Sequence, residues 1–572
     1  MENFLSALQK IDGTYYRVFI GIFRYAAPIL LLLLLIRCVW PLLTFRREPE
    51  IWAWLCLPDD RKIPLTHWEN AIGRSKRSDV VIDFPTVSRN HAVLTRYDDG
   101  SWTITDTESK DGVKVNGSKV QICAVEPEDV ISIGGIDMTL QPISPRQEER
   151  LAQLRTKASS FWTSFANILL LTVFQVLCIT GFLLSGTEEM GSILIGFGGI
   201  ILCEWLLLIF YSFIRRSSFE VETIAFLLCT MGMAVLASVA PGESVKELMA
   251  IILGILLFLM VGWSLRDLER VKKIRYLAGF LGIGFLVFTL VFGEKDYGAK
   301  NWVHIGPLSL QPSELSKICF VFIGASTMDR IMHKRNLILF IAYSVVVCGC
   351  LALMNDFGTA LIFFFAFLVI AYLRSGSVGT VALAVTALVF AAVVAFKIAP
   401  HALARFRNWR HIWEDPLDGG YQQTRALMCL ASGGLLGLGL GKGWMENVFA
   451  ADSDMVFATV TEEWGLLIAF MLLLCIVALA LFAVRSAGVA RSSFYIIGSC
   501  TAAAILLVQV ILNVLGTLDI VPLTGVTFPF VSNGGSSMLC SWGLLAFIKA
   551  SDTRQNASFA VRLHKKGRED DE

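Results

Sequence analysis

The chain has 572 residues, of which 55% are hydrophobic and 17% are charged, and its formal net charge at pH 7 is +1. About a quarter of the residues of an average soluble protein are charged. The apolar residues here are also gathered into runs of about 18 to 25, the length of a helix that crosses a bilayer. These values exclude a soluble enzyme, a disordered chain and a nucleic-acid-binding protein that works through bulk charge.

The first apolar run, residues 25–45, predicts a membrane helix near the N-terminus. Arg46 and Arg47 follow this run, and such basic residues stay on the cytoplasmic side of a membrane. A signal peptide is the alternative, but the run is long, begins late and lacks a small-residue cleavage site. We therefore expect residues 1–48 to form a membrane anchor whose C-terminal end is cytoplasmic.

Residues 50–145 predict a small all-β domain. Apolar and polar residues alternate in stretches such as SWTITDT and VKVNGSKV, as they do in half-buried strands. Asp99-Gly100 and Asn116-Gly117 stand between such stretches, and these dipeptides favour hairpin turns.

Residues 146–217 lead the chain back into the membrane through a charged linker and two helices. From residue 161 onward we predict about twelve helices that are long and apolar enough to span a bilayer. If residue 160 is cytoplasmic, nearly every basic cluster falls on an inside loop, and the β domain and the tail 551–572 are cytoplasmic too. The predicted ranges are 161–185, 189–213, 218–240, 246–265, 275–293, 315–328, 336–353, 357–373, 376–398, 456–484, 494–515 and 537–550.

Three long connections fall on the outer side in this topology. They are EKDYGAKNWVHIGPLSLQPSE, residues 399–454 and IVPLTGVTFPFVSNGGSS. Irregular backbone at membrane depth is tolerated where it is buried in protein or lines a wet cavity. Asp356, between two apolar runs, faces the same side. We therefore expect the polar chemistry of this chain at its outer face.

Four features of the β domain occur in a recognisable order: Gly73-Arg74, then SDVVI, then VSRNH, then DTESKDGVKVNG. An arginine and a serine on loops at one end of a sandwich suit a phosphate, because the guanidinium binds two oxygens and the hydroxyl donates to a third. An ordinary surface arginine and loop serine would give the same pattern. In order and spacing, however, the features resemble the forkhead-associated (FHA) domain, which binds phosphothreonine peptides and whose histidine is structural. The matching residues are Gly73, Arg74, Ser88, His91, Gly112, Asn116 and Gly117.

The resemblance implies that Arg74 and Ser88 contact the phosphate of a protein phosphorylated on threonine. Lys110 and Asp111 stand where the family has Thr-Asn. An aspartate cannot donate the hydrogen bonds with which that asparagine holds the peptide backbone, so atypical peptide selection is expected. Arg89 and Lys110 would add positive charge. The candidate phosphopeptide-binding residues are Arg74, Ser88, Arg89, Lys110 and Asp111.

Four segments of the membrane region resemble a single family, in that family's order. They are GAKNWVHIGPLSLQPSELSK (298–317), NDFGTALI (355–362), the stretch from GYQQTR to TEEWG (420–465) and NVLGTLDIVPLTGVTFPFVSNGGSS (513–537). The family is that of the SEDS proteins, for shape, elongation, division and sporulation, which includes FtsW, RodA and SpoVE. The resemblance covers residues 218–550. It implies a polytopic α-helical membrane protein with a SEDS ten-helix core, to which the extra N-terminal helices and an inserted all-β FHA sandwich are additions.

The same resemblance implies peptidoglycan glycosyltransfer at the outer face of a bacterial cell membrane. The substrate would be lipid II, a disaccharide-pentapeptide on undecaprenyl pyrophosphate, and the enzyme would be an inverting hexosyltransferase that polymerises it. A protein embedded in the bilayer suits a lipid-linked substrate, and attack by a sugar hydroxyl needs a base. Besides membrane lipid, the family's usual partner is a class B penicillin-binding protein, a transpeptidase. No nucleic-acid partner is expected.

Asp454 aligns with the catalytic aspartate of the family and stands just before a predicted helix. The resemblance therefore implies that Asp454 is the general base that activates the acceptor hydroxyl. The residues alone leave an alternative open, because an aspartate at a helix N-terminus satisfies the free amides of the first turn.

Further acids fall within the same motifs. Glu462 and Glu463 lie about 12 Å further along the same predicted helix, at about 1.5 Å per residue. Ionisable groups at that depth are costly and are functional candidates, although inward hydrogen bonding within the bundle is an equal alternative. Glu314 and Lys317 share one helix face, where they form either a structural ion pair or a substrate contact.

One departure from the family concerns the first motif, where Asn301-Trp302 replaces Arg-Trp. Lys300 would restore the missing positive charge only in part, and Arg425 adds a charge in a later motif. The candidate substrate-binding residues are Glu314, Lys317, Asp356, Lys300, Trp302, Gln422, Glu462, Glu463, Ser532 and Ser536.

No cofactor is assigned from the sequence. A cluster of Asp454, Asp356 and Glu314 would suit Mg²⁺ or Mn²⁺ if the fold brought the three together. The segment GLLGLGLGKG is not a Walker A loop, because Leu436 stands in place of its first glycine. Close backbone packing in a re-entrant loop is expected instead. Glu204 is an isolated acid in an added helix.

Two other functions remain open. A lipid II flippase or transporter would also need many helices and buried acids, but it should carry polar residues at mid-membrane, whereas the acids here cluster toward the outer face. A catalytically weak scaffold that reads phosphoproteins is the second, and Asn301 favours it. Glycosyltransfer is the function that we expect.

Overall fold

The computed structural model describes residues 13–44, 50–76, 78–97, 100–144, 147, 160–187, 189–296, 299–305, 308–326, 334–375, 378–398, 409–554 and 557–559. Several features named above lie outside these residues. They are Arg46 and Arg47, Asp99, most of the linker 146–159, the whole of 327–333 after the predicted helix that begins at 315, the segment 399–408 and residues 560–572.

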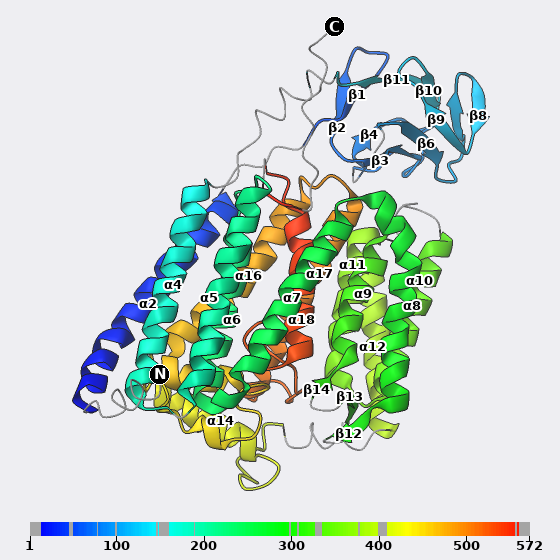
Figure 1. The fold of residues 1–572 in the computed structure, drawn as a ribbon. Helices are drawn as coiled ribbons and strands as arrows, with labels where there is room; N and C mark the ends of the chain where they lie inside the picture. Colours follow the sequence, from blue (N-terminus) through cyan, green and yellow to red (C-terminus); the bar gives the residue numbers. More distant parts are fainter. Residues whose placement is uncertain are drawn as a thin grey trace.

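Long helices lie side by side and form most of the molecule, and the β domain stands at one end of this bundle (Figure 1). Among the described residues, nine helices are long and apolar enough to cross a membrane. The bundle contains α2 (Gly13–Thr44), α4 (Phe161–Ser185), α5 (Met190–Phe213), α6 (Glu220–Val239), α7 (Ser244–Leu265), α8 (Leu268–Phe292), α9 (Pro312–Ser326), α10 (Lys334–Leu353), α11 (Phe357–Ser375), α12 (Val378–Ile398), α16 (Leu466–Ala487), α17 (Ser493–Thr517) and α18 (Gly535–Ala550).

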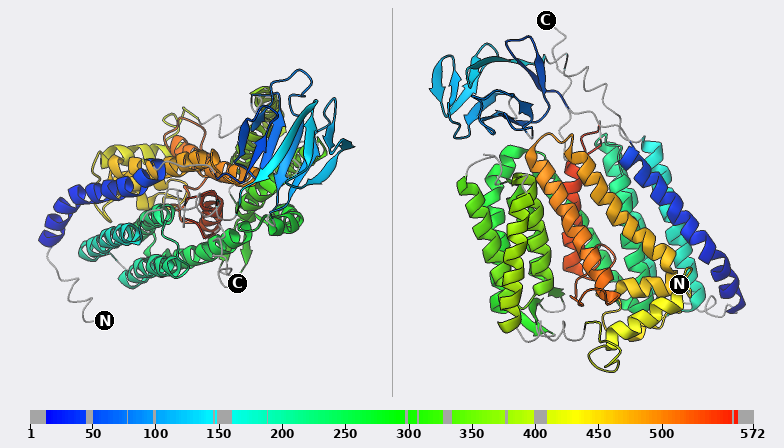
Figure 2. Two further views of the ribbon diagram at one scale, coloured as in Figure 1. Left: turned by 90° about the horizontal axis from the view of Figure 1, so that it is seen from above. Right: turned by 180° about the vertical axis from the view of Figure 1, so that it is seen from behind.

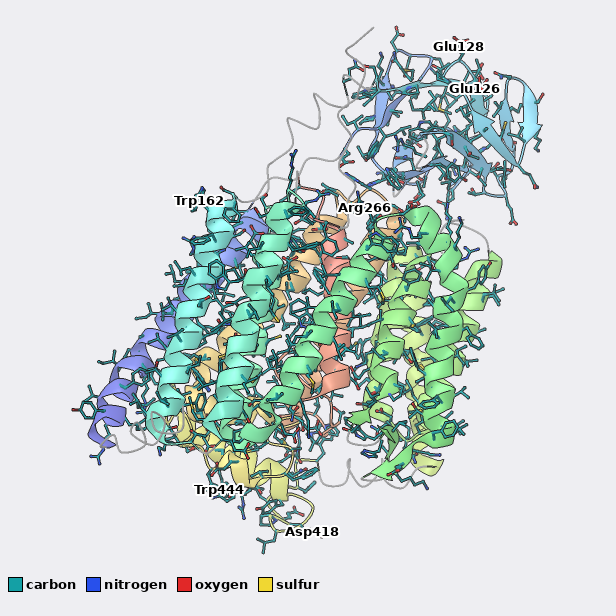
Figure 3. All side chains as sticks on the ribbon, viewed as in Figure 1. Glu126, Glu128, Trp162, Arg266, Asp418 and Trp444 are labelled. Atoms are coloured by element: carbon teal, nitrogen blue, oxygen red, sulfur yellow. The ribbon has the colours of Figure 1, made fainter. Side chains whose placement is uncertain are left out.

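The two ends of the bundle differ in what they carry. We call the end next to the β domain the β-domain end, and Figure 3 labels Trp162 and Arg266 there. The opposite end, the loop end, carries α14 (Tyr421–Gly433), and Figure 3 labels Asp418 and Trp444 on it.

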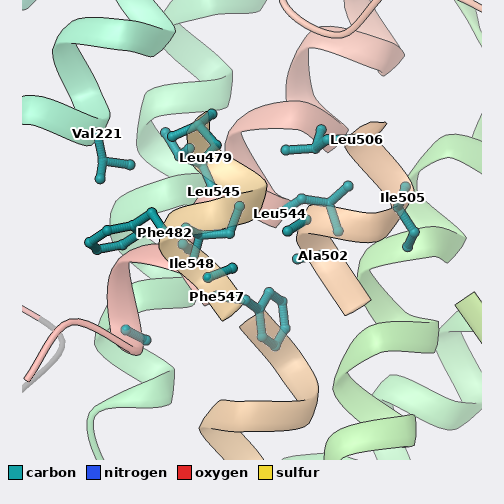
Figure 4. Close-up of a cluster of buried hydrophobic side chains, with 14 of the residues drawn as sticks. Val221, Leu479, Phe482, Ala502, Ile505, Leu506, Leu544, Leu545, Phe547 and Ile548 are labelled. Atoms are coloured by element: carbon teal, nitrogen blue, oxygen red, sulfur yellow. The ribbon is translucent and has the colours of Figure 1, made fainter. Parts of the chain in front are cut away.

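The centre of the bundle is an apolar core built around α6, whose residues from Glu220 to Ser238 are all buried. Side chains of α16, α17 and α18 meet one another beside α6, as Figure 4 shows for Phe482, Leu506, Leu545 and Val221. In a membrane such helices are held together by close packing rather than by the exclusion of water. The helices α2, α4 and α5 flank this core: α2 packs against α4 and α16, and α5 packs against α7 (Figure 2).

The β domain is a sandwich of two sheets, so the predicted all-β fold is confirmed. One sheet has the order β2-β1-β11-β10-β7-β8 and the other has the order β4-β3-β5-β6-β9. The predicted turn at Asn116-Gly117 joins β7 to β8, and both residues have the positive φ that a tight hairpin needs. The strands are β1 (Ala53–Cys56), β2 (Lys62–Leu65), β3 (Glu69–Gly73), β4 (Val80–Val81), β5 (Ala92–Arg96), β6 (Trp102–Asp106), β7 (Val113–Val115), β8 (Ser118–Val120), β9 (Ile122–Val125), β10 (Val130–Ile133) and β11 (Ile136–Pro142).

The β domain docks on the short connection between α16 and α17. The buried carboxylate of Glu69 accepts hydrogen bonds from the hydroxyl of Ser492 at 2.9 Å and from the backbone N–H of Ser493 at 3.0 Å. Arg491 forms an ion pair with Glu50 at 2.9 Å. The domain therefore supplies a carboxylate to the N-terminal end of α17, where free amides and the helix dipole favour a negative charge.

Three expectations about the elements were wrong in detail. The first apolar run was expected from residue 25, but α2 begins at Gly13. The expected start was too late because Arg17 and Arg24 interrupt the apolar pattern without ending the helix. The segment after α8 was expected to be irregular, but it forms a three-stranded sheet of β12 (Glu294–Asp296), β13 (Ala299–Ile305) and β14 (Leu308–Leu310).

The third correction concerns the predicted helix 456–484, which is two helices. The short helix α15 (Val456–Trp464) ends at Gly465, and α16 begins at the next residue. Gly465 has φ 86° and ψ 163°, a conformation that glycine adopts more readily than any other residue. The apolar periodicity continues through the break, so the sequence pattern did not reveal it.

Candidate functional site

Asp454 lies at the loop end, in the turn that leads into α15. The residue at the cap position of α15 is Met455, whose side chain makes no hydrogen bond to the first turn. Asp454 lies one residue before this cap position. The half-buried carboxylate of Asp454 lies beside Gly525, where an added Cβ would come within 3.3 Å of Oδ2.

The backbone around Asp454 is fixed from two other elements. The side-chain amide of Asn513 on α17 donates to the Asp454 carbonyl at 3.0 Å and to the Val526 carbonyl at 2.8 Å. Ser532 donates its hydroxyl to the Ser453 carbonyl at 2.6 Å. The turn that carries Asp454 is thus held by α17 and by the connection between α17 and α18.

Of two predicted substrate-binding serines, Ser532 lies on the same connection and Ser536 lies in the first turn of α18, and the structure gives both hydroxyls backbone partners. Ser532 also accepts from the backbone N–H of Phe528 at 2.8 Å. Ser536 accepts from the backbone N–H of Gln311 at 2.9 Å. Asn533, which sequence reasoning did not single out, donates to a carboxylate oxygen of Asp452 at 2.7 Å.

Glu462 and Glu463 are buried at the C-terminal end of α15, and not within a continuing helix as predicted. A carboxylate oxygen of Glu462 accepts from the backbone N–H of Met445 at 2.9 Å. A carboxylate oxygen of Glu463 accepts from the hydroxyl of Ser238 on α6 at 2.6 Å. The inward hydrogen bonding that the sequence left as an alternative is therefore present.

The glycine-rich segment 433–443 explains how a helix break is tolerated here. Its backbone N–H groups at Leu438 and Gly439 donate to the last carbonyls of α15, those of Glu462 and Glu463, at 2.8 and 3.0 Å. Its Gly434 carbonyl accepts from the first amide of α16. The segment therefore satisfies backbone groups that the two helix ends leave free.

This arrangement confirms the predicted close backbone packing of the glycine-rich segment. A Cβ on Gly437 would lie 2.1 Å from the Glu463 carbonyl oxygen, and one on Gly433 would lie 2.1 Å from the Thr461 carbonyl oxygen. No other residue fits at these positions without moving backbone. The glycines are needed for contact with α15 rather than for binding a nucleotide.

Asp356 stands at the start of α11 and accepts the Thr359 amide at 3.1 Å, as a helix cap does. Two side-chain amides reach its other oxygen, from Asn301 at 3.4 Å and from Gln311 at 3.3 Å. Asn301, which replaces the family arginine, thus meets Asp356 with a hydrogen bond and without a positive charge.

Glu314 and Lys317 form a buried ion pair at 2.5 Å on α9. Among the residues that the structure describes, the second carboxylate oxygen of Glu314 has no hydrogen-bond partner. Lys300 donates its ammonium to the Leu290 carbonyl at 2.5 Å, at the C-terminal end of α8. Such a contact is typical of a lysine at a helix C-terminus.

The other two candidates at the loop end, Gln422 and Trp302, have other contacts than the candidate acids do. Gln422, on the exposed side of α14, donates to the Phe449 carbonyl at 3.2 Å. Trp302 is half-buried on β13 and pairs across the sheet with Glu294. Within the described chain, no three His, Cys, Asp or Glu side chains are grouped as a metal site. Asp454, Asp356 and Glu314 therefore do not form the cluster that Mg²⁺ or Mn²⁺ would need.

In the β domain, the loops around Ser88 form one connected site. The Ser88 carbonyl accepts from the backbone N–H of Arg74 at 3.0 Å, and its hydroxyl accepts from that of Lys110 at 3.1 Å. The buried His91 accepts from the Ser88 amide at 3.0 Å and donates to the Gly112 carbonyl at 3.2 Å, which fits a structural role. A Cβ on Gly73 would lie 2.3 Å from the Arg89 carbonyl oxygen.

The side chains proposed to face a phosphopeptide remain accessible. Arg74, Arg89, Lys110 and Asp111 are exposed, and Ser88 is half-buried. They come from the loops that follow β3, precede β5 and precede β7. The predicted residues are thus brought to one end of the sandwich.

Glu204 is an acid for which the sequence showed no partner. It is fully buried and accepts from the hydroxyl of Thr172 at 3.0 Å and from the side-chain amide of Gln175 at 3.1 Å, both on α4. The same amide donates to Thr230 on α6 at 2.9 Å. These partners lie on other helices, so only the packing of α4, α5 and α6 reveals them.

A multi-pass helical core with buried acids at its loop end and a β-sandwich at the other end defines the class of this molecule. The FtsW/RodA/SpoVE model, described as "Cell cycle protein", matches residues 221–556, and the FHA domain model matches residues 70–134. The chain belongs to the FtsW/RodA/SpoVE family of cell cycle proteins, and it is a multi-pass membrane protein with an FHA domain.

Named relatives agree with this assignment. Peptidoglycan glycosyltransferase RodA of Mycobacterium tuberculosis (strain ATCC 25618 / H37Rv) is 29% identical over 322 residues, which cover 53% of this chain and 69% of that protein. Probable peptidoglycan glycosyltransferase FtsW of Thiomicrospira cyclica is 31% identical over 273 residues, covering 45% of this chain and 69% of that protein. A solved chain from "Structural coordination of polymerization and crosslinking by a peptidoglycan synthase complex" is 25% identical with a TM-score of 0.50, covering 58% of this chain and 96% of that one.

Proposed function

We propose that this chain is a peptidoglycan glycosyltransferase that polymerises lipid II, with Asp454 as its general base. The acceptor sugar hydroxyl attacks the anomeric carbon of the donor sugar, and its proton passes to the Asp454 carboxylate. Undecaprenyl pyrophosphate leaves with the electrons of the broken bond, and the direct displacement inverts the anomeric carbon. The relatives named for this activity support the proposal.

The observation that carries the proposal is the setting of Asp454. Its backbone is held by Asn513, while Met455 and not Asp454 occupies the cap position of α15. The absence of a side chain at Gly525 keeps space free beside the carboxylate. A base whose backbone is fixed in position suits proton transfer within hydrogen-bond reach of a substrate.

The proposed substrate-binding set keeps the residues that the motifs indicated. Glu462, Glu463 and Asp356 hold their hydrogen bonds to amides and hydroxyls, and these can be exchanged for sugar hydroxyls as lipid II binds. Lys300 and the Glu314–Lys317 pair are engaged in internal contacts, and any role in binding substrate would be added to these. The other members are Trp302, Gln422, Ser532 and Ser536.

We further propose that the loop end faces the outside of the cell membrane and the β-domain end faces the cytoplasm. The basic positions 215, 216, 266, 270, 374, 485 and 491 fall on connections or helix ends at the β-domain end, and basic residues favour the cytoplasmic side. The functional division proposed is an anchor at 1–48, an FHA domain at 50–145, a linker with two added helices at 146–217, the SEDS domain at 218–550 and a cytoplasmic tail at 551–572.

Two protein partners follow from this proposal. One is a class B penicillin-binding protein, which would cross-link the glycan strands, and a synthase complex with polymerisation and crosslinking is named for the solved relative. The other is a cytoplasmic protein phosphorylated on threonine. Its phosphate would meet Arg74 and Ser88, because a phosphate carries close to two negative charges and three acceptor oxygens.

The decisive test replaces Asp454 by asparagine in the purified full-length protein. Asp454→Asn keeps size and shape but removes the base, so polymerisation of lipid II should fall about 10² to 10⁴-fold. Asp418→Asn, the same change in the exposed part of the loop end, is the matched control and should keep the wild-type rate. Near wild-type polymerisation by Asp454→Asn would contradict the assignment. Movement of lipid II between leaflets without glycan product would favour a flippase.

A catalytically weak scaffold is the second candidate function, and Asn301 is the observation that favours it. The Asn301 amide reaches Asp356 but brings no charge to neutralise a pyrophosphate leaving group. Asn301→Arg should therefore raise the rate of polymerisation if the missing charge limits it. An unchanged rate in an active wild-type protein would remove this argument for a weak enzyme.

The phosphopeptide site is tested on the same full-length protein. Arg74→Ala should abolish binding of phosphothreonine peptides, because the bidentate contact with the phosphate is lost, and should leave polymerisation unchanged. Arg61→Ala, at another exposed arginine of the β domain, is the control. A phosphothreonine peptide library bound no better than its unphosphorylated counterpart would reduce the β domain to a phosphate-independent docking module.

A further inference from the structure

The helix α2 lies outside the segment that the family model matches, yet it touches the backbone of the loop end. The hydroxyl of Tyr16 donates to the Leu440 carbonyl at 2.7 Å, and the guanidinium of Arg24 donates to the Leu438 carbonyl. Both carbonyls belong to the glycine-rich segment 433–443. Residues separated by more than four hundred positions in the chain are thus in direct contact.

The segment between α2 and α15 is held on both of its edges. Toward α15, the Leu438 and Gly439 amides bind the carbonyls of Glu462 and Glu463. Toward α2, the Leu438 carbonyl is bound by Arg24. Leu438 therefore links α2 to the acidic pair, because its carbonyl accepts from Arg24 and its N–H donates to the Glu462 carbonyl.

An arginine at this place in a membrane helix costs free energy, which suggests a functional role. Ionisable side chains within membrane helices are costly and mark functional positions. Around Arg24, the exposed face of α2 is apolar, with Ile22 and Ile29 each 65% exposed. Arg24 is turned inward, where it lines a small cavity together with Glu463 and Trp464. Within the described chain, no ion pair joins it to Glu463, so its guanidinium serves the backbone of the glycine-rich segment.

We propose that Tyr16 and Arg24 are positioning residues for Glu462 and Glu463. They hold the glycine-rich segment, and that segment sets the place of the acidic pair in the substrate site. The inference rests on the proposed function, in which the pair contacts lipid II. Misplacement of a reacting or binding group by about 1 Å costs about 10²-fold in rate, so loss of either contact should lower kcat.

The seat of α2 does not depend on these two hydrogen bonds. Arg37 donates to the side chain of Asn167 on α4 at 2.8 Å, and Phe23 packs edge-on against Trp464 with ring centroids 5.7 Å apart. Helix α2 also packs along α4 and α16. Removal of one hydroxyl or one guanidinium should therefore loosen the glycine-rich segment and leave the helix in place.

The test uses pairs of identical changes on α2 in the full-length protein. Tyr16→Phe is compared with Tyr15→Phe, whose side chain is 66% exposed. Arg24→Gln is compared with Arg17→Gln at an exposed arginine of the same helix. Hydrogen exchange at the Leu438 and Gly439 amides is measured together with kcat and KM for lipid II. Arg24→Lys is included because an ammonium can still donate to the Leu438 carbonyl.

We expect faster exchange at both amides and a kcat about 10 to 10²-fold lower in Tyr16→Phe and Arg24→Gln. KM and phosphopeptide binding should stay unchanged, Arg24→Lys should recover part of kcat, and both controls should match the wild type. Unchanged exchange would overturn the inference whatever the activity. Faster exchange with unchanged kcat would also overturn it, provided that Glu463→Gln lowers kcat. If Glu463→Gln polymerises like the wild type, the proposed role of the acidic pair fails, and the positioning of that pair falls with it.

Discussion

Buried carboxylates gather at both ends of the helical core, and the two groups are satisfied in different ways. At the β-domain end, Glu222 forms an ion pair with Lys549 at 3.0 Å, and both side chains are fully buried. Asp552 forms an ion pair with Arg554 at 2.7 Å, and Tyr211 donates its hydroxyl to Glu222 at 2.5 Å. Glu222 and Asp552 thus each have a cation, whereas Glu69 of the docked β domain is held by a hydroxyl and a backbone amide.

At the loop end, several buried acids are held without a cation, among them Glu462, Glu463, Asp356 and Glu247. Among the described residues, Glu462, Glu463 and Asp356 form no ion pair, and their partners are backbone amides, side-chain amides and a hydroxyl. Burial of an acid without a cation costs free energy of folding. Such a cost is expected where the acid has a functional role. The contrast agrees with the proposal that the second group contacts substrate, and we expect the first group to hold the helices together.

The pair Glu314–Lys317 breaks the pattern, because it lies at the loop end and is nevertheless an ion pair. It is the residue pair for which the sequence left a structural role and a substrate contact equally open. Because its carboxylate is paired with a cation, it resembles the acids Glu222 and Asp552 of the β-domain end. The three predictions that follow test the comparison at each group and then at this exception.

The largest effect is expected at the β-domain end. Lys549→Met leaves the Glu222 carboxylate buried without a cation, which should lower the free energy of unfolding by about 3 to 5 kcal/mol. Equilibrium unfolding in detergent micelles measures this loss. The double variant Lys549→Met with Glu222→Gln should recover most of it, because no buried charge remains unpaired. A single variant as stable as the wild type would remove the structural role of this group.

The next effect is expected at the loop end and in activity rather than stability. Glu463→Gln should lower kcat for lipid II polymerisation about 10²-fold. Its free energy of unfolding should change by less than about 1 kcal/mol, because the amide oxygen still accepts the Ser238 hydroxyl. Glu222→Gln is the same change at the other end and should do the reverse, with lower stability and an unchanged kcat per folded molecule. Equal effects of the two variants on kcat and on stability would show that the acids of the two ends do not differ in role.

The smallest effect is expected at the exception. Glu314→Gln weakens a charge-assisted hydrogen bond to Lys317, which should lower the free energy of unfolding by about 1.5 to 3 kcal/mol. If the pair is structural, like the acids of the β-domain end, kcat should stay unchanged. Activity and unfolding are measured on the same preparation. A fall in kcat with full stability would instead indicate that the pair contacts the substrate. The presence of a cation beside a buried acid would then not distinguish a structural acid from a substrate-binding one.

The sequence by itself determined the classes of element and the order of the motifs. Apolar runs of membrane length predicted the bundle, because a single helix in lipid must satisfy its backbone internally and be apolar along its length. Period-two alternation and Asn116-Gly117 predicted the β-sandwich and one of its hairpins. The family motifs pointed to Asp454, Glu462 and Glu463 before any geometry was known.

Only the tertiary structure decided how those residues are held. Apolar periodicity runs through Gly465 without a signal, so the break between α15 and α16 depends on the glycine-rich segment that satisfies both helix ends. The same holds for Glu204, whose partners lie on α4. Hydrogen bonds between residues far apart in the chain leave no local pattern.

The helix α2 shows the limit most clearly. Its apolar run, expected from residue 25, predicted an anchor, and Arg24 lay just outside the expected run. In the fold, Arg24 and Tyr16 contact carbonyls of the glycine-rich segment. The sequence determined that α2 would lie in the membrane, because hydrophobicity is a local property. Which surface the helix covers was decided by packing, because that depends on the shape and the unsatisfied backbone groups of α16 and the glycine-rich segment.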